Sequence, residues 1–323
     1  ADARTRKIGF WEQNQGTTFT IPYSRLDAFL DSWRGKKMTK TKIERGYIYP
    51  KLPNHTHSKI PEKIELDEDF GFIIGLYLAE GWATDTFWGI SNNEDCVRER
   101  VIAWCEKLSL SYTIREAKDK SFKVGTPDEY TLMGKSTDVI IHGVFWPRFL
   151  KKWVGTGSAL KRVPPEAYVA PKPFVKGLLD GYITGDGCVH LNGHITASSV
   201  SKALIIGISN LMTRFGIFGR LTTHIVKKPE GHRIKTENCL PCHNLYIGVA
   251  MSRQFATEIG SFHPKKHERL QTITLNTSKP SSKYRIEKDI ALDKISCITF
   301  HKASRDTVYD LTVPETLNFS IGN

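Results

Sequence analysis

The stretch that decides the fold reads FIIGLYLAEG at residues 72–81, and a similar stretch, LLDGYITGDG, follows at residues 178–187. Each is an apolar run with small residues at intervals, which predicts a helix. Each ends in a carboxylate followed by glycine, and the two carboxylates are Glu80 and Asp186. A carboxylate in the last turn of a helix is unfavourable, because that end already carries partial negative charge. Two matched acids in this position therefore predict a binding site for a cation.

The composition is that of a globular protein without a membrane segment. The 323 residues give room for two or three domains, each with its own core. The longest apolar run, at residues 70–79, is too short to span a bilayer, and no signal-peptide pattern opens the chain. Six scattered cysteines do not resemble a disulfide framework. We therefore expect a cytoplasmic protein, associated with the nucleoid, or a nuclear one in a eukaryote.

The basic surface is the second clue to function. A net charge of +12 favours polyanions, chiefly nucleic acid. A solvated surface is the alternative for any single cluster of basic residues, but several clusters beside a pair of acids favour DNA or RNA. The residues that we expect to contact nucleic acid are Arg34, Lys36, Lys37, Lys40, Lys42, Lys227, Lys228 and Lys265.

The chain contains an internal duplication. Both halves predict the order helix, strand, strand, helix, strand, strand, helix, and IIHGVFWPRFLKKWVG at residues 140–155 resembles LYIGVAMSRQFATEIG at residues 245–260. Six residues beyond the glycine that closes each of these stretches stands a lysine, Lys161 or Lys266. The duplication predicts a monomer with pseudo-two-fold symmetry.

Individual elements follow from capping signals and periodicity. In the first half we expect helices at residues 70–79, from a cap at residues 91–93 to 108, and at 146–154, with strands at 86–90, 111–115 and 137–142. In the second half we expect helices at residues 171–186, from a cap at residues 198–199 to 215, and at 252–259, with strands at 188–195, 218–226 and 245–249. Beyond them, His263 and His267 are expected to be exposed in a basic loop.

The paired acids suit a divalent metal. Gly75 together with Gly177 or Gly181 would let the two helices approach closely, so that Glu80 and Asp186 meet. Two close carboxylates raise each other's pKa unless a cation lies between them, and hard oxygen ligands favour Mg²⁺ or Mn²⁺. Metal ions at such a site support phosphodiester hydrolysis. The alternative for either segment alone is an ordinary glycine-containing helix end.

These segments resemble the two dodecapeptide motifs of the LAGLIDADG homing endonucleases, especially the intein-encoded branch. The resemblance rests on GLYLAEG at residues 75–81, on LKRVP at residues 160–164 and on residues 204–217, which end in RFGI. It extends over about residues 66–270. Glutamate in place of aspartate at position 80 departs from the usual motif but keeps the carboxylate.

The resemblance implies an α+β fold, with a pseudo-two-fold duplicated αββαββα core whose two sheets form a DNA-binding saddle, flanked by small, mostly β segments. It also implies a monomer that cuts both strands of DNA at a long, rare site, with divalent metal at Glu80 and Asp186. Backbone ligands of that metal are not specified. Lys161 matches the family's catalytic lysine, whereas Lys266 rests on the repeat alignment, and Lys265 competes with it.

Four segments follow from these comparisons. Residues 1–63 are a basic region, either an arm that contacts DNA or the remnant of a splicing domain. Residues 64–170 and 171–275 are the two endonuclease repeats, and residues 276–323 form an intein-like C-terminal segment. Within the last segment, VYDLTVPETLN at residues 308–318 resembles a splicing block of inteins. Because Ala1 offers no nucleophile and Asn323 lacks the usual context of a cyclising asparagine, we expect no self-splicing.

Two other functions and one other metal stay open at this stage. The chain could be a self-splicing intein, or a DNA- or RNA-binding protein that no longer cuts. Cys239, Cys242 and His243 have a zinc-like spacing, but four-coordinate zinc needs further ligands, for which His224 and His232 are candidates.

Overall fold

The computed structural model describes residues 12–14, 16–20, 41–50, 58–116, 120–123, 131–134, 136–225, 239–275, 285–287, 290–292 and 297–300. The chain divides into two compact units, Ala1–Pro280 and Ser281–Asn323. The first unit contains the duplicated core, and its elements position the site described below.

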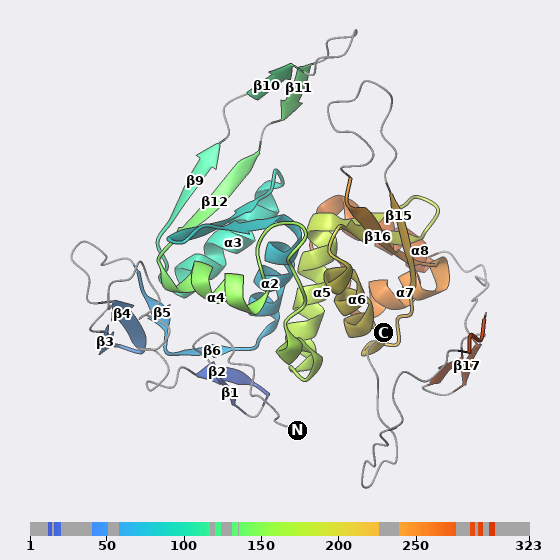
Figure 1. Ribbon diagram of the computed structural model, residues 1–323, viewed down its shortest axis with the longest axis horizontal. Coiled ribbons are helices and arrows are strands. Elements are labelled where there is room, and N and C mark those ends of the chain that lie inside the picture. The colour runs from blue at the N-terminus through green and yellow to red at the C-terminus, as the bar shows by residue number, and fades with distance from the viewer. Residues whose placement is uncertain are drawn as a thin grey trace. The chain divides into compact units, whose positions relative to one another are not determined.

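Two helices pack side by side at the centre of the core, α2 (Glu68–Glu80) and α5 (Lys172–Asp186) (Figure 1). Their backbones touch: a Cβ added to Gly75 would lie 2.0 Å from the carbonyl oxygen of Leu178, and one added to Gly177 would lie 2.0 Å from that of Glu68. Gly181 lies in the same way against Phe72. Only glycine permits this approach. The predicted role of these glycines is confirmed.

Local sequence fixes where the two helices begin and end. The Asp67 carboxylate caps α2 by accepting a hydrogen bond of 2.8 Å from the Phe70 N–H. Proline at the second position of α5 suits a first turn, where no N–H is needed. Each helix ends at its carboxylate, and the glycine that follows begins a strand. The predicted helices are confirmed, and α2 is slightly longer than predicted.

The first repeat places a four-stranded antiparallel sheet beside α2. Its order is β7-β8-β12-β9, and its strands are β7 (Gly81–Ala83), β8 (Phe87–Ser91), β12 (Thr137–His142) and β9 (Tyr112–Glu116). Helices α3 (Asp95–Lys107) and α4 (Phe145–Trp153) pack on this repeat. Trp88, Trp104 and Trp146 meet in the core that the sheet and helices enclose.

The second repeat has the same topology, with the order β13-β14-β16-β15. Its strands are β13 (Gly187–Val189), β14 (Ile195–Ser199), β16 (Pro241–Ile247) and β15 (Arg220–Ile225). Its further helices are α6 (Lys202–Thr213), α7 (Val249–Glu258) and α8 (Pro264–Leu275). A 3-10 turn, η1 (Pro165–Tyr168), precedes α5. Because the two sheets have equivalent order, the predicted duplicated α+β fold is confirmed.

Several predicted boundaries are wrong. The strand expected at residues 188–195 is two strands joined by a turn, in which Gly193 has φ +90°. Ser201 caps α6, since its hydroxyl accepts from the Leu204 N–H, so the cap expected at residues 198–199 lies too early. Glu94 precedes α3 without a side-chain cap bond, so residues 91–93 are not its cap. The basic loop expected around His263 and His267 continues as helix α8.

Small sheets flank the core, as expected. One has the order β1-β2-β6 and another β3-β4-β5. Their strands are β1 (Glu12–Asn14), β2 (Thr18–Thr20), β6 (Lys63–Glu65), β3 (Thr41–Glu44), β4 (Tyr47–Pro50) and β5 (Ile60–Pro61). Two hairpins complete the described strands, β10 (Lys120–Lys123) with β11 (Thr131–Gly134) and, in the second unit, β17 (Arg285–Glu287) with β18 (Ile290–Leu292). Within the described residues, no helix has both the length and the apolar character needed to cross a bilayer.

Candidate active site

Glu80 and Asp186 meet where the two central helices end. They are the last residues of α2 and α5, and both line a cavity of about 630 Å³. Lys161 lines the same cavity. Three of the four residues predicted to be catalytic therefore share one cavity, although they are widely separated in the sequence.

The two carboxyls resist ionisation in the absence of a cation. Burial raises the pKa of Glu80, and the charge of Asp186 raises it further. Asp186 has an exposed side chain, yet the protein around it still desolvates the carboxyl enough to raise its pKa. The charges of Lys161 and Lys266 oppose both shifts. A pair of carboxylates whose pKa values stay raised despite these two lysines fits a hard divalent cation such as Mg²⁺ or Mn²⁺.

Lys161 lies against the end of α2. Its Nζ donates a hydrogen bond of 3.2 Å to the Ala79 carbonyl oxygen and lies 5.4 Å from the centre of the Tyr77 ring. Only 5% of the residue is exposed. Burial lowers the pKa of Lys161 to about 8, against the opposing charges of the two carboxylates.

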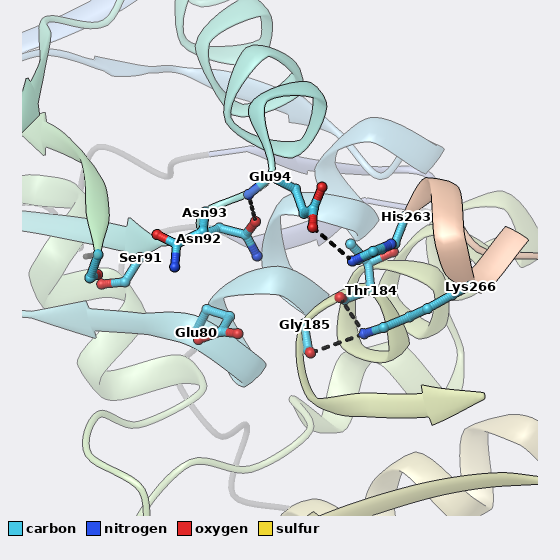
Figure 2. A pocket seen from close by; sticks show the side chains of 10 residues that line it. Glu80, Ser91, Asn92, Asn93, Glu94, Thr184, Gly185, His263 and Lys266 are labelled. Carbon is cyan, nitrogen blue, oxygen red and sulfur yellow. Dashed lines mark hydrogen bonds and ion pairs between the residues drawn. The ribbon is translucent and has the colours of Figure 1, made fainter. Parts of the chain in front are cut away.

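Lys266 lies against the end of α5 in the equivalent way. Its Nζ donates to three carbonyl oxygens, those of Ile183 at 2.8 Å, Thr184 at 2.7 Å and Gly185 at 3.2 Å. Figure 2 shows its side chain extending from α8 to Thr184 and Gly185. Burial lowers the pKa of Lys266. Lys265, the competing candidate, is exposed and makes none of these three bonds.

Each lysine offsets negative charge at the end of one central helix. A helix that ends in a carboxylate places negative charge on its negative end, and an ammonium bonded to the last carbonyl groups offsets that charge. Lys161 does so for α2 and Lys266 for α5. The acids and lysines therefore form two similar half-sites related by the duplication.

A second cavity, of about 310 Å³, lies on the Lys266 side of Glu80. The turn before α3 lines it with Asn92, Asn93 and Glu94, and the other repeat contributes His263 and Lys266 (Figure 2). The Glu94 carboxylate lies 3.6 Å from Nε2 of His263. Sequence analysis missed Glu94 and expected His263 to be exposed, whereas only 13% of its side chain is exposed.

The outward face of the first sheet carries a polar network beside the acids. Arg115 on β9 donates to the Asp138 carboxylate at 2.6 Å and 3.1 Å. The Ser91 hydroxyl donates to the same carboxylate at 2.6 Å, and the Trp82 indole N–H donates to Ser91 at 3.1 Å. Sequence analysis did not single out these residues.

The outward face of the second sheet is also polar. Ser198 donates to Asn244 at 2.5 Å, and Asn244 pairs with His224 at 2.9 Å. The Arg220 guanidinium lies 5.5 Å from the centre of the Tyr246 ring. Both sheets thus present hydrogen-bonding and cationic side chains on their outward faces.

The predicted nucleic-acid contacts lie mostly outside the described residues. Lys42 is exposed on β3, where it pairs with Glu44 at 3.0 Å, and Lys265 is exposed on α8. Outside the described residues lie Arg34, Lys36, Lys37, Lys40, Lys227 and Lys228.

The possible zinc ligands do not form a cluster in the described part of the chain. No three residues among the described His, Cys, Asp and Glu are grouped to hold a metal ion. His224 pairs with Asn244 instead, and His232 lies outside the described residues.

Comparisons with known proteins identify related sequences. Residues 173–260 match the family model of a LAGLIDADG-like domain. The chain is 34% identical over 245 residues to the DNA-directed RNA polymerase subunit Rpo1C of Methanocaldococcus jannaschii, which covers 73% of this chain and 25% of the subunit. It is 25% identical over 283 residues to the DNA polymerase of a Thermococcus species, which covers 80% of this chain and 15% of the polymerase. The chain thus spans a quarter or less of these relatives.

Solved structures give weaker similarities. The homing endonuclease I-DmoI, in a complex with DNA and Mn, superposes with a TM-score of 0.42 at 10% identity, over 60% of this chain and 97% of that protein. Full-length DUF199/WhiA superposes with a TM-score of 0.43 at 13% identity, over 68% of this chain and 63% of that protein.

Proposed function

We propose that this chain, which carries a LAGLIDADG-like domain as its sequence predicted, is a site-specific endonuclease that makes a double-strand break in DNA. The observation that carries the proposal is the pair of half-sites. Glu80 and Asp186 end adjacent helices, and each helix end holds one buried or half-buried lysine. This arrangement suits hydrolysis of one phosphodiester in each strand.

The two acids are the residues that would hold Mg²⁺ or Mn²⁺. A divalent ion bound there would supply Lewis acidity and a water of lowered pKa. Glu80 and Asp186 would hold the ion at the ends of α2 and α5. Their raised pKa values mean that binding the cation releases protons whenever either carboxyl is protonated beforehand.

The lysines act on charge and protons at each half-site. An ammonium beside the acids stabilises the negative charge that develops on a phosphate oxygen during hydrolysis. Because the pKa of Lys161 is lowered to about 8, this amine also exchanges a proton close to neutral pH. Lys266 takes the same role for the other strand, and Lys265 does not.

Double-stranded DNA is the substrate that the surface fits. The chain has a net charge of +12, and the outward faces of both sheets carry polar and cationic side chains suited to base edges and phosphates. One duplicated chain supplies both half-sites, so a monomer suffices.

An origin inside a host protein is also part of the proposal. The relatives are polymerases of which the chain matches only 15% to 25%. This fits a segment inserted into a longer protein, as an intein-encoded endonuclease would be. Self-splicing is not proposed, and the segment that resembles a splicing block lies outside the described residues.

The test is cleavage of DNA from which the inserted segment is absent. We would incubate the chain with uninterrupted archaeal genes for the large RNA polymerase subunits and for DNA polymerase, in Mg²⁺, Mn²⁺, Ca²⁺ or EDTA. We expect one cleaved position in Mg²⁺ or Mn²⁺ and no cleavage in EDTA. Glu80→Gln and Asp186→Asn should abolish cleavage.

A matched control distinguishes the neighbouring lysines. With protein in saturating excess, Lys265→Met should cut bound DNA at the wild-type rate, because an exposed phosphate contact affects binding and not the chemical step. Lys161→Met and Lys266→Met should cut bound DNA slowly. Cleavage by the two acid variants at the wild-type rate would overturn the mechanism. DNA binding without cleavage in any metal would favour the alternative of a binding protein, and ligation of flanking domains fused to the chain would favour the splicing alternative.

A further inference from the structure

The two catalytic-lysine candidates sit on short segments that are held in different ways. We call residues 155–161 and residues 260–266 the first and second lysine arms. The two arms occupy equivalent places in the two repeats. The first begins just after α4 at Gly155 (φ +84°), and the second begins just after α7 at Gly260 (φ +79°). Each lysine reaches the end of its own central helix.

The first lysine arm is held by neutral groups. The Tyr77 hydroxyl on α2 donates to the Gly155 carbonyl oxygen at 3.1 Å. From the other repeat, the Ser201 hydroxyl donates to the Lys161 carbonyl oxygen at 2.6 Å. Both bonds are buried, so the arm has one anchor on its own central helix and one from the opposite repeat.

The second lysine arm is held by a buried carboxylate, in addition to a neutral contact of 3.3 Å between the hydroxyls of Ser261 and Thr184. The Asp180 carboxylate on α5 accepts the Phe262 N–H at 2.7 Å and the Thr184 hydroxyl at 3.0 Å through the same oxygen. Its other oxygen lies 3.6 Å from the guanidinium of Arg100, which comes from α3 of the first repeat. Only 7% of Asp180 is exposed.

Arg100 joins the two repeats at this point. Its guanidinium lies 3.8 Å from the centre of the Phe72 ring and 4.6 Å from that of the Phe262 ring, and it bonds Asp69 at 3.2 Å. Arg100 therefore packs between an aromatic residue of α2 and one of the second lysine arm, where a planar cation is well suited.

Asp180 and Arg100 together form a clamp on the second lysine arm, and the described residues of the first repeat contain no equivalent of it. Ile74 stands six residues before Glu80, as Asp180 stands six residues before Asp186. Ile74 is fully buried and apolar, so it offers no acceptor to the first lysine arm. The acids and lysines repeat between the two half-sites, and the anchors of the lysine arms do not.

We infer that Asp180 and Arg100 are positioning residues for Lys266, which set the cleavage of one DNA strand independently of the other. The Phe262 N–H bond fixes the second lysine arm, and that arm fixes how far Lys266 reaches towards the end of α5. Tyr77 performs this task for Lys161. The inference rests on the proposed endonuclease function, because it assigns each lysine to one strand.

Because Asp180 titrates, the rate at which the Lys266 strand is cut should depend on pH in a way that the rate for the Lys161 strand does not. Burial raises the pKa of Asp180 to about 6, against the effects of the Phe262 N–H, Thr184 and Arg100. The negative charge of Glu68 on α2 raises it further. Below that pH the carboxyl is neutral and holds Phe262 and Arg100 less tightly. No comparable titrating group holds the first lysine arm among the described contacts.

The test measures each strand separately. A target duplex labelled differently on its two strands is cut in single turnover, and Lys266→Met and Lys161→Met identify the strand that each lysine serves. Asp180→Leu should slow the Lys266 strand about tenfold or more and leave the other within about twofold. Tyr77→Phe should slow the Lys161 strand instead. Nicked DNA should therefore accumulate with opposite strands intact in the two variants.

Asp180→Asn separates the hydrogen bond from the charge. It keeps an acceptor oxygen for the Phe262 N–H, so it should recover most of the rate that Asp180→Leu loses. It cannot titrate, so the fall in the rate of the Lys266 strand relative to the Lys161 strand below about pH 6 should disappear. Protonation of Glu80 and Asp186 slows both strands alike. Equal slowing of both strands by Asp180→Leu, or a pH profile unchanged in Asp180→Asn, would overturn the inference.

Hydrogen exchange tests the anchor without any cleavage. In the free full-length chain, the Phe262 amide should exchange about tenfold faster or more in Asp180→Leu than in the wild type, whereas residues 155–161 should be unaffected. An unchanged exchange rate sinks the inference even if the chain cuts DNA. If the wild type cuts no DNA, the proposed function fails, and faster exchange of this amide still supports the clamp.

Discussion

Replacing Asp180 by asparagine tests how much free energy the fold loses by ionising a buried carboxyl. The side chain lies on α5 with 7% of the residue exposed, and it keeps its hydrogen bonds to Phe262 and Thr184. Asparagine has nearly the same shape and can accept the same two bonds. The substitution therefore keeps the packing but removes the charge, and with it the ion pair to Arg100.

The magnitude follows from the pKa of Asp180, which burial raises from 3.8 to about 6. Between these values the folded carboxyl is protonated while the unfolded one is ionised, so the unfolded state binds fewer protons. The free energy of unfolding then falls as the pH rises, and the fall is complete above about pH 6. At about 1.4 kcal/mol for each pH unit of separation, the loss is about 3 kcal/mol.

The assay is urea unfolding of the wild type and Asp180→Asn, followed by tryptophan fluorescence, because Trp88, Trp104 and Trp146 lie in the core. Titrating groups shared by both proteins cancel in the difference. The stability of the variant relative to the wild type should increase by about 3 kcal/mol between about pH 4 and pH 7.

A control matches the change in charge at an exposed site. Asp95→Asn removes a carboxylate whose side chain is 84% exposed, so its effect should stay below about 1 kcal/mol over the whole range. A difference between wild type and Asp180→Asn that stays constant with pH would refute the reasoning. A difference that shrinks would show that Arg100 stabilises the carboxylate more than burial destabilises it.

Three further predictions follow from the central helices. Gly75→Ala should destabilise the chain by about 3 kcal/mol or more in the same urea assay, because its Cβ would meet a carbonyl oxygen at 2.0 Å. As a control, Gly248→Ala should cost less than about 1 kcal/mol, because its Cβ would meet nothing nearer than 3.8 Å. Without metal, Glu80→Gln should raise the thermal stability, because it removes a carboxyl whose pKa is raised. With Mg²⁺, the variant should not gain the stabilisation that the ion gives the wild type. An equal shift of the melting temperature by Mg²⁺ in both proteins would contradict the metal site. With saturating protein in single turnover, Lys266→Met should slow cleavage of one strand about a hundredfold. An equal loss in Lys265→Met under the same conditions would show that the contacts to α5 do not identify the working lysine.

The central helices and the acids at their ends could be predicted because local sequence determines them. Glycine spacing, the Asp67 cap and the carboxylate before glycine are all contained within each motif. The duplication then allowed Lys161 and Lys266 to be predicted, because comparing the two repeats shows which residues recur. Lys266 lies at the end of α5, where the repeat alignment put it.

Contacts between distant segments that the duplication does not repeat could not be predicted. The Asp180 carboxylate bonds a backbone N–H that stands 82 residues away, and a backbone amide leaves no mark in the sequence. Asp180 also has no counterpart in the first repeat, where Ile74 stands, so the duplication that identified the lysines could not identify it. The sequence shows that Asp180 is an acid within an apolar helix, but it does not show that the Phe262 N–H is its partner.

Helix α8 was missed because its sequence is dominated by charge. PKKHERLQ begins with proline at the first helical position, which is favourable, but Leu270 and Ile273 are the only buried residues among those of the helix whose burial is described. Three apolar residues in twelve, all in the second half of the helix, are too few for a periodic signal. The cap of α6 was misplaced because several serines stand close together before the helix. Ser201 is the cap because its hydroxyl reaches the Leu204 N–H, and its position depends on where strand β14 ends.

The clamp also bears on why the two half-sites differ. A buried carboxylate that costs about 3 kcal/mol is a poor way to hold a segment when a neutral hydroxyl, such as that of Tyr77, holds the equivalent one. Stability alone would favour an apolar residue at this position, as in the first repeat. The geometry gives Asp180 what an apolar residue lacks, an acceptor for Phe262 and a partner for Arg100 of the other repeat. A charge that weakens the fold while it ties the second lysine arm to the first repeat is better explained by the placement of Lys266 than by packing.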